Sequence, residues 1–187
     1  MTRGVRRLIV LVVVAVGLFA LAGQALAADP TVDAVGDAAC APTEPNFNGG
    51  NGVPGAVYPA RNCVQKSVSD LVVNSLPTAL LDLGDNQYDN GELANYNNVY
   101  GSSFGRANSV VYPSLGNAEY NTAKASGFFG YFGQSSTGVF SRIQADGGDN
   151  SHLTTGGYYS FNIGGWHVIA LNSNCFSTGV PGGCGVG

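Results

Sequence analysis

The chain has 187 residues, of which 11% are charged and 44% are hydrophobic, a composition typical of a folded domain rather than a disordered chain. Residues 1–27 hold three of the eight basic residues and no acid, so the remainder carries five basic residues against twelve acidic ones. This acidic balance argues against a nucleic-acid binder, which would present a basic face.

The start of the chain has the pattern of a secretory signal peptide. Three arginines precede an uncharged apolar run over 8–21, and the small residues Ala25 and Ala27 mark a cleavage point. The run is shorter than the ~20 residues that span a bilayer, which disfavours an uncleaved anchor. We therefore expect a signal peptide at 1–27, a domain at 28–187, and a secreted or cell-wall-associated protein without stable membrane insertion.

Three short β-rich runs in the mature part, over 31–36, 79–83 and 110–115, predict strands. Pro113 places the third run at an edge or an end of a sheet, because proline cannot donate to a strand ladder. Asp82, inside the second run, is expected to be a hydrogen-bonded polar residue and not a catalyst.

Helical patterns separate these runs. The first has an apolar stripe at helical spacing, formed by Val64, Val68, Leu71 and Val72. Asn62 and Gln65 have the spacing of a capping box at its start, and Pro77 ends it. The second helical stretch presents Leu93, Tyr96 and Tyr100 on one face, and the aromatic residues within 128–132 are expected to belong to the core.

An antiparallel hairpin is predicted near the end, because the runs 158–163 and 166–171 flank Gly164-Gly165. The continuous apolar residues 168–171 predict a strand buried on both faces. The order β-α-β-α-β followed by a hairpin predicts an α/β fold with a mixed sheet.

Four cysteines, an even number, suit an oxidising compartment. They allow three pairings, of which neighbour pairing closes the shortest loops and is the one we expect, namely Cys40–Cys63 and Cys175–Cys184. The absence of a Cys-x-x-Cys unit argues against a cysteine zinc cluster.

Each predicted parallel strand is followed by a glycine and then by an oxygen-bearing side chain, Asp37, Asp85 or Asn117. The carboxyl ends of adjacent parallel strands meet in one crevice, so we expect these side chains to lie together. Tyr88, three residues after Asp85, could point into the same crevice. Carboxylate and amide oxygens suit a metal cation, although Gly-Asp and Gly-Asn are also ordinary turn sequences.

The blocks Gly36-Asp37, Gly84-Asp85-Asn86-Gln87-Tyr88 and Gly116-Asn117-Ala118-Glu119 together resemble those of the calcineurin-like metallophosphoesterases. The Asp-x-x-Tyr spacing is similar to the purple acid phosphatase branch, in which a tyrosinate replaces a histidine ligand. The stretch 166–175 resembles secreted bacterial members, and the resemblance runs from about residue 32 to residue 187. It implies the N-terminal portion of an α/β sandwich and hydrolysis of small phosphate esters.

The resemblance also implies roles for the site residues. Asp37 and Tyr88 would hold one metal ion, Asp85 would bridge two ions, and Asn117 would hold the second, with iron, zinc or manganese as the ions. Ala118 stands where the family has a proton-transferring histidine.

The later histidine blocks of the family have no counterpart here, and neither His152 nor His167 is expected to replace them. We therefore expect an incomplete phosphoesterase with weak metal occupancy and little or no activity. A secreted pseudoenzyme or phosphate-binding module, suggested by Ala118, is the alternative. An extracellular adhesion domain would rest only on the Gly/Asn-rich β character.

Overall fold

The computed structural model describes residues 29–55 and 62–174. The predicted signal peptide at 1–27 and the predicted Cys175–Cys184 disulfide lie outside this part. Among the helices of the described residues, none combines the length and apolar character needed to cross a membrane.

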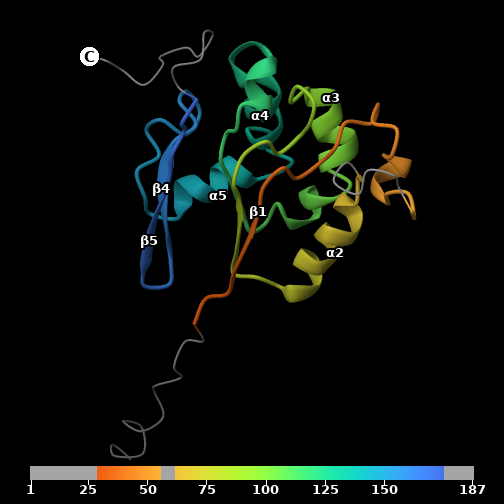
Figure 1. Ribbon diagram of the computed structural model, residues 1–187. Coiled ribbons are helices and arrows are strands. Elements are labelled where there is room, and N and C mark those ends of the chain that lie inside the picture. The colour runs from red at the N-terminus through yellow and green to blue at the C-terminus, as the bar shows by residue number, and fades with distance from the viewer. Residues whose placement is uncertain (1–28, 56–61, 175–187) are drawn as a thin grey trace, which may run out of the picture.

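The centre of the fold is a parallel sheet of three strands in the order β1-β2-β3 (Figure 1). The strands are β1 (Val32–Val35), β2 (Ala79–Asp82) and β3 (Val111–Pro113), as the β-rich runs predict. β2 lies in the middle of this sheet and is more buried than β1. Pro113 ends an outer strand, so the prediction of an edge or end position is confirmed.

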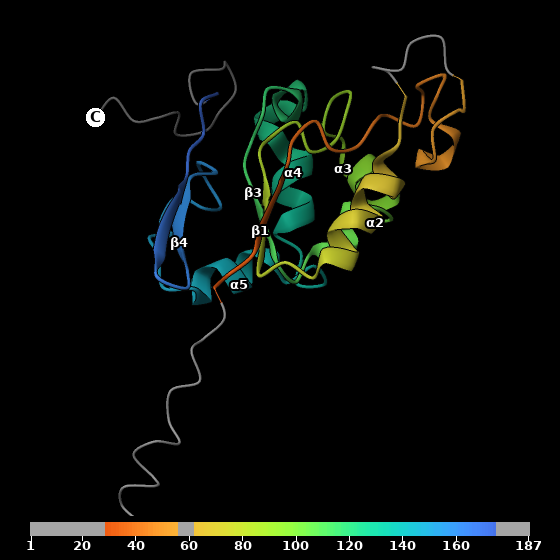
Figure 2. The same ribbon diagram turned by 60° about the horizontal axis from the view of Figure 1, so that its bottom comes forward.

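The helices lie mainly on one face of this sheet, and the hairpin lies on the other (Figure 2). α2 (Gln65–Ser75) connects β1 to β2. Between β2 and β3 lie α3 (Leu93–Asn95), the π-turn η3 (Tyr96–Tyr100) and the 3-10 turn η4 (Phe104–Ala107). The other helical elements are η1 (Asn48–Gly50), η5 (Ala118–Asn121), η6 (Ala123–Ala125), α4 (Ser126–Phe132) and α5 (Val139–Ala145).

The predicted hairpin is confirmed as β4 (Tyr159–Ile163) and β5 (Trp166–Ala170), but it forms a separate two-stranded sheet. The expectation of one mixed sheet is therefore wrong. The physical reason is face-to-face packing: the Phe161 ring stacks on Tyr112 of β3 with centroids 3.7 Å apart. In addition, the Tyr159 hydroxyl donates to the Pro113 carbonyl at 2.9 Å.

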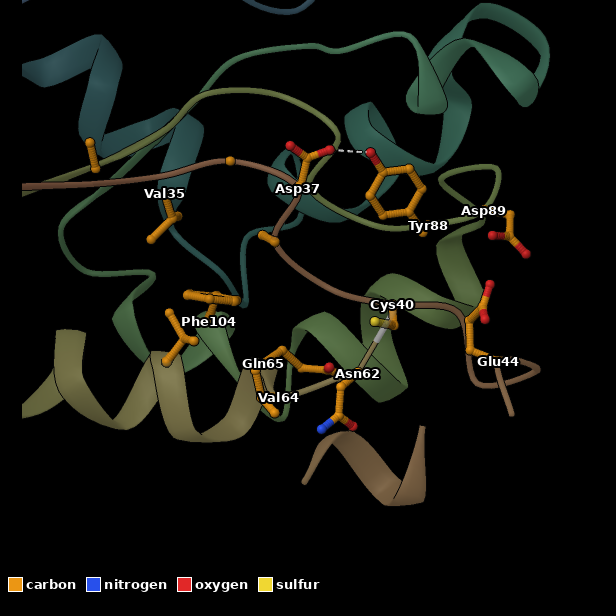
Figure 3. A pocket seen from close by; sticks show the side chains of 14 residues that line it. Val35, Asp37, Cys40, Glu44, Asn62, Val64, Gln65, Tyr88, Asp89 and Phe104 are labelled. Atoms are coloured by element: carbon orange, nitrogen blue, oxygen red, sulfur yellow. Dashed lines mark hydrogen bonds between the residues drawn. The ribbon is translucent and has the colours of Figure 1, made fainter. Parts of the chain in front are cut away.

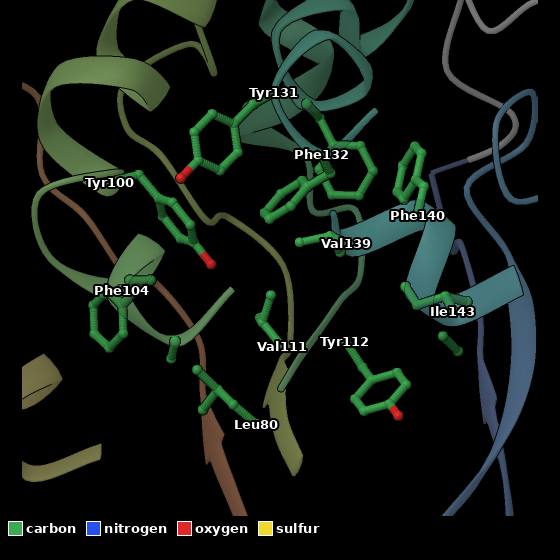
Figure 4. Packing of buried hydrophobic residues seen from close by; sticks show 14 of the residues in the cluster. Leu80, Tyr100, Phe104, Val111, Tyr112, Tyr131, Phe132, Val139, Phe140 and Ile143 are labelled. Atoms are coloured by element: carbon green, nitrogen blue, oxygen red, sulfur yellow. The ribbon is translucent and has the colours of Figure 1, made fainter. Parts of the chain in front are cut away.

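Aromatic side chains fill the space between the sheet and its helical layer (Figure 4). Phe128 and Phe132 of α4 are buried with ring centroids 4.9 Å apart, and Tyr96 and Tyr100 pack edge-on or tilted against the same cluster. The expectation that the 128–132 aromatics belong to the core is confirmed. Such rings bury large apolar areas and prefer tilted or edge-to-face contacts.

The predicted core-facing stripe of α2 is largely wrong. Val72 is buried, but Val64, Val68 and Leu71 are exposed, the last to 71%. The buried face of α2 instead includes Ser69, whose hydroxyl accepts a hydrogen bond from Arg106 of η4 at 2.6 Å. Helical periodicity marks an apolar face, but it does not determine which element covers that face.

Two local predictions are also corrected. Asn62 does not cap α2, because its side chain bonds the backbone N–H and carbonyl of Val53 at 2.6 and 3.1 Å. The run 168–171 is not buried on both faces, since Ile169 is exposed on the outer side of the hairpin and Leu171 is 73% exposed. Both errors concern long-range partners that a local pattern does not contain.

Candidate functional site

The loops that follow β1 and β2 run side by side, and this brings their acidic residues together. The Ala38 N–H donates to the Asp85 carbonyl at 3.1 Å, and the Ala39 N–H donates to the Asn86 carbonyl at 3.1 Å. Asp37 and Asp85 both have left-handed backbone conformations, with φ of 52° and 50°. The two chains therefore make matched turns at Asp37 and Asp85, each of which presents a carboxylate, and their pairing continues to Ala39 and Gln87.

The Tyr88 side chain joins these two carboxylates. Its hydroxyl lies within hydrogen-bonding distance of both Asp37 Oδ1 and Asp85 Oδ2, the latter at 2.7 Å. Figure 3 shows the contact with Asp37. Burial and then the hydrogen bonds to Asp37 and Asp85 raise the pKa of the Tyr88 hydroxyl well above its usual range. The phenol thus keeps its proton at neutral pH, and because it has a single hydrogen it donates to one of the two carboxylates at a time.

The loop after β3 reaches the same place. The Ala118 N–H donates to Asp85 Oδ1 at 2.9 Å, and Gly116 lies so close that a Cβ there would collide with the Asp85 carboxylate. Asn117 lies between these two residues and is exposed, and its side chain makes no hydrogen bond with the described residues. The structure thus brings Asp37, Asp85 and Tyr88 into contact, with Asn117 beside them but unattached.

Glu119 is the residue that sequence reasoning missed. This buried carboxylate accepts hydrogen bonds from the N–H groups of Asn86 at 2.8 Å and Asp85 at 3.1 Å. It also accepts from the Gly116 N–H at 2.7 Å and the Tyr96 hydroxyl at 3.0 Å. Glu119 therefore holds the loops after β2 and β3 together. Its place in the Gly116–Glu119 block was the only signal in the sequence.

The buried Gln87 side chain also stabilises the loops that carry the site. The Gln87 carboxamide donates to the carbonyls of Tyr88 at 2.8 Å and Cys40 at 3.1 Å, and accepts from the Tyr100 N–H at 3.1 Å.

The Tyr100 hydroxyl donates to Asp82 at 2.8 Å, which confirms that Asp82 is a hydrogen-bonded polar residue. The predicted Cys40–Cys63 disulfide is also present, and it ties the first loop to the segment before α2.

The two histidines lie elsewhere. The His152 ring stacks on Tyr158 with centroids 4.4 Å apart, and His167 Nδ1 lies 2.8 Å from Asn162 Oδ1. Both line a separate cavity beside the hairpin that includes Asp149. Within residues 29–55 and 62–174, no three His, Cys, Asp or Glu side chains are grouped so as to hold a metal ion.

The donors that do converge are two carboxylates and a phenol. Such an all-oxygen set suits a hard cation, and a tyrosinate suits iron(III), whereas the borderline ion zinc usually takes nitrogen or sulfur ligands as well. The residues present therefore fit one hard cation, with fewer protein ligands than a dinuclear centre generally has.

Comparisons of this chain with family models, with curated proteins and with solved structures find no match. Its function is therefore inferred from the chemistry of the crevice.

Proposed function

We propose that this protein is an exported metal-dependent phosphoesterase, to whose site the described residues contribute an incomplete set of metal ligands. The observation that carries the proposal is the contact of the Tyr88 hydroxyl with both Asp37 and Asp85 at adjacent strand ends. A cation in this crevice would replace the phenolic proton, because positive charge offsets the burial and the carboxylates that hold the proton in place.

Asp37, Asp85 and Tyr88 would hold the metal, and Asn117 would join them from the loop after β3. A bound metal ion supplies hydroxide at neutral pH by lowering the pKa of its water, and it stabilises charge on a phosphoryl oxygen. The chain's own contribution is positional: the Ala118 N–H orients Asp85, and Glu119 holds the loop that carries Asp85. Export rests on the signal-peptide pattern at 1–27, and its test is the N-terminal sequence of the secreted protein.

A phosphate-binding module without catalysis is the second candidate, and Ala118 favours it. This buried methyl side chain can neither donate nor accept a proton beside Asp85. Loss of one proton-transfer group typically lowers a rate by about 100-fold to 10,000-fold. Binding of inorganic phosphate without chelator-sensitive hydrolysis of p-nitrophenyl phosphate would favour this candidate over the enzyme.

The test of the metal site is a spectroscopic and calorimetric titration. Iron(III) bound to a phenolate absorbs visible light, so the parent chain should develop a visible band that is absent in Tyr88→Phe. Tyr158→Phe, which alters a tyrosine of the hairpin cavity, is the matched control and should keep the band. Zinc and manganese should bind weakly. An identical band in Tyr88→Phe, or no binding of any of the three ions by the parent chain, would contradict the proposal.

A further inference from the structure

A groove with a volume of about 920 Å³ lies between Asp37 and Tyr88, the end of β1 at Ala34 and Val35, and the start of α2 (Figure 3). Val35, Val64 and Val68 give it an apolar wall. Val64, which immediately precedes α2, and Val68 of α2 belong to the predicted helical stripe, and the described structure leaves both exposed. The apolar wall of this groove is thus suited to packing against further side chains.

One polar side chain in this groove lacks its hydrogen bonds. Gln65 lines the groove and is only 3% exposed, yet neither its Oε1 nor its Nε2 has a hydrogen-bond partner among residues 29–55 and 62–174. Figure 3 shows this side chain extending from α2 toward Asn62 and the Cys40 disulfide. A buried polar atom left unpaired costs about 1–3 kcal/mol, so a carboxamide with two such atoms indicates a ligand that both donates and accepts.

The outer edge of β1 also presents both hydrogen-bond donors and hydrogen-bond acceptors, which are backbone N–H and C=O groups. β1 has β2 as its neighbour on one side, and it is an outer strand of the sheet. The carbonyls of Thr31 and Val35 accept hydrogen bonds from β2, so the backbone groups of Val32 and Ala34 face away from it. Unpaired N–H and C=O groups on a strand edge form a template for another strand.

The acidic side chains of the groove indicate which kind of segment it can bind. Asp37, Glu44 and Asp89 line it, and the described lining residues include no lysine or arginine. A second copy of this chain, added edge to edge, would place one acidic rim against another. A neutral or basic segment would avoid that repulsion.

We propose that this groove binds an extended strand of neutral or basic composition from another polypeptide. The strand adds to the outer edge of β1, one of its peptide groups pairs with the Gln65 carboxamide, and its apolar side chains pack on Val64 and Val68. Strand addition of this kind derives affinity from main-chain hydrogen bonds and specificity from side-chain pockets. The proposal uses none of the metal chemistry, but the groove shares Asp37 and Tyr88 with the proposed metal site. Peptide binding is therefore measured without added metal ions, so that its outcome is separate from that of the metal titration.

The test uses a blocked hexapeptide of alternating valine and threonine with one terminal lysine, and a matched peptide in which glutamate replaces lysine. Binding is measured by fluorescence anisotropy, and amide hydrogen exchange of β1 is followed by NMR. The lysine peptide should bind more tightly than the glutamate peptide and should slow exchange at Val32 and Ala34. N-methylation of the peptide should abolish both effects.

Variants of the protein separate binding from folding. Gln65→Leu should bind the lysine peptide about tenfold more weakly, the loss expected for one or two hydrogen bonds. Its urea midpoint should be unchanged or higher, because two unpaired polar atoms are removed. Gln144→Leu, on the exposed side of α5, is the control and should leave the affinity unchanged.

Several outcomes would overturn the proposal. These are no binding of either peptide at millimolar concentration, equal affinity of Gln65→Leu and the parent, or slow exchange at Val32 and Ala34 before peptide is added, which would mean that the chain fills its own groove. Formation of a dimer through β1 in ultracentrifugation would assign the groove to a second copy instead.

Discussion

The Tyr96 hydroxyl donates to the Glu119 carboxylate at 3.0 Å, and both side chains are completely buried. Through this contact the aromatic core reaches the candidate metal site, because Glu119 also accepts N–H groups from the loops after β2 and β3. The position of Asp85 is therefore coupled to the packing of the helical layer. A substitution that changes the packing of the helical layer should therefore also shift Asp85.

Removal of the Glu119 carboxylate should be strongly destabilising. Glu119→Ala leaves several buried N–H groups and the Tyr96 hydroxyl without an acceptor, so we expect a loss of about 3–5 kcal/mol in the free energy of unfolding. Glu92→Ala, at an exposed position, should cost less than about 0.5 kcal/mol. Urea denaturation measures both, and equal stabilities of the two variants would show that the buried network is not formed.

Gly116 should tolerate no side chain. A Cβ at this position would collide with the Asp85 backbone nitrogen and carboxylate, so Gly116→Ala should displace Asp85, cost about 1–3 kcal/mol and weaken iron(III) binding. Gly165→Ala in the hairpin turn is the control, because a Cβ there meets no atom within 4 Å. Parent-like metal binding by Gly116→Ala would mean that Asp85 does not hold the ion.

Stability should fall as the pH rises from acid toward neutral. Burial raises the pKa of the Asp82 carboxyl well above its usual value near ~4, although the Tyr100 hydrogen bond opposes this. A carboxyl with a raised pKa in the folded state stabilises the fold below its unfolded pKa, and this contribution is lost as the pH climbs toward the folded pKa. Asp82→Asn, which stays neutral, should flatten the decline above about pH 4 in urea titrations. An unchanged slope would show that Asp82 titrates normally.

The Cys40–Cys63 disulfide should contribute about 3 kcal/mol, because it closes a loop with a sequence separation of 23. The double variant Cys40→Ala, Cys63→Ala should lose that amount in urea denaturation. Peptide mapping without reduction should recover the Cys40–Cys63 pair and, as the sequence predicts, a Cys175–Cys184 pair. A peptide joining Cys40 to Cys175 would refute the predicted pairing.

Ala118→His in this 187-residue chain should not produce phosphoesterase activity. A proton-transfer residue can assist only where a metal ion already activates water, and no imidazole ligand accompanies the three oxygen donors among the described residues. The measurement is hydrolysis of p-nitrophenyl phosphate with and without chelator. Chelator-sensitive turnover by this variant would show that the site is complete without further ligands.

The strand set, the hairpin turn and the Cys40–Cys63 disulfide could be predicted from the sequence. These features depend on short-range signals: β-rich runs between turn residues, Gly164-Gly165 at the hairpin, and neighbouring cysteines in the chain. The sequence also placed Asp37, Asp85 and Tyr88 in one crevice, because parallel strands deliver their carboxyl ends to the same edge.

Which faces of the elements are covered depends on how those elements pack and could not be predicted from the sequence. The hairpin packs on the parallel sheet through Phe161 and Tyr112 and does not join its edge, and α2 turns its Val64 and Val68 side away from the core. The roles of Glu119 and Gln65 likewise depend on partners, present or absent, that lie far away in the chain. Periodicity and propensity describe one element at a time, whereas burial and hydrogen bonding are set by the elements that pack against it.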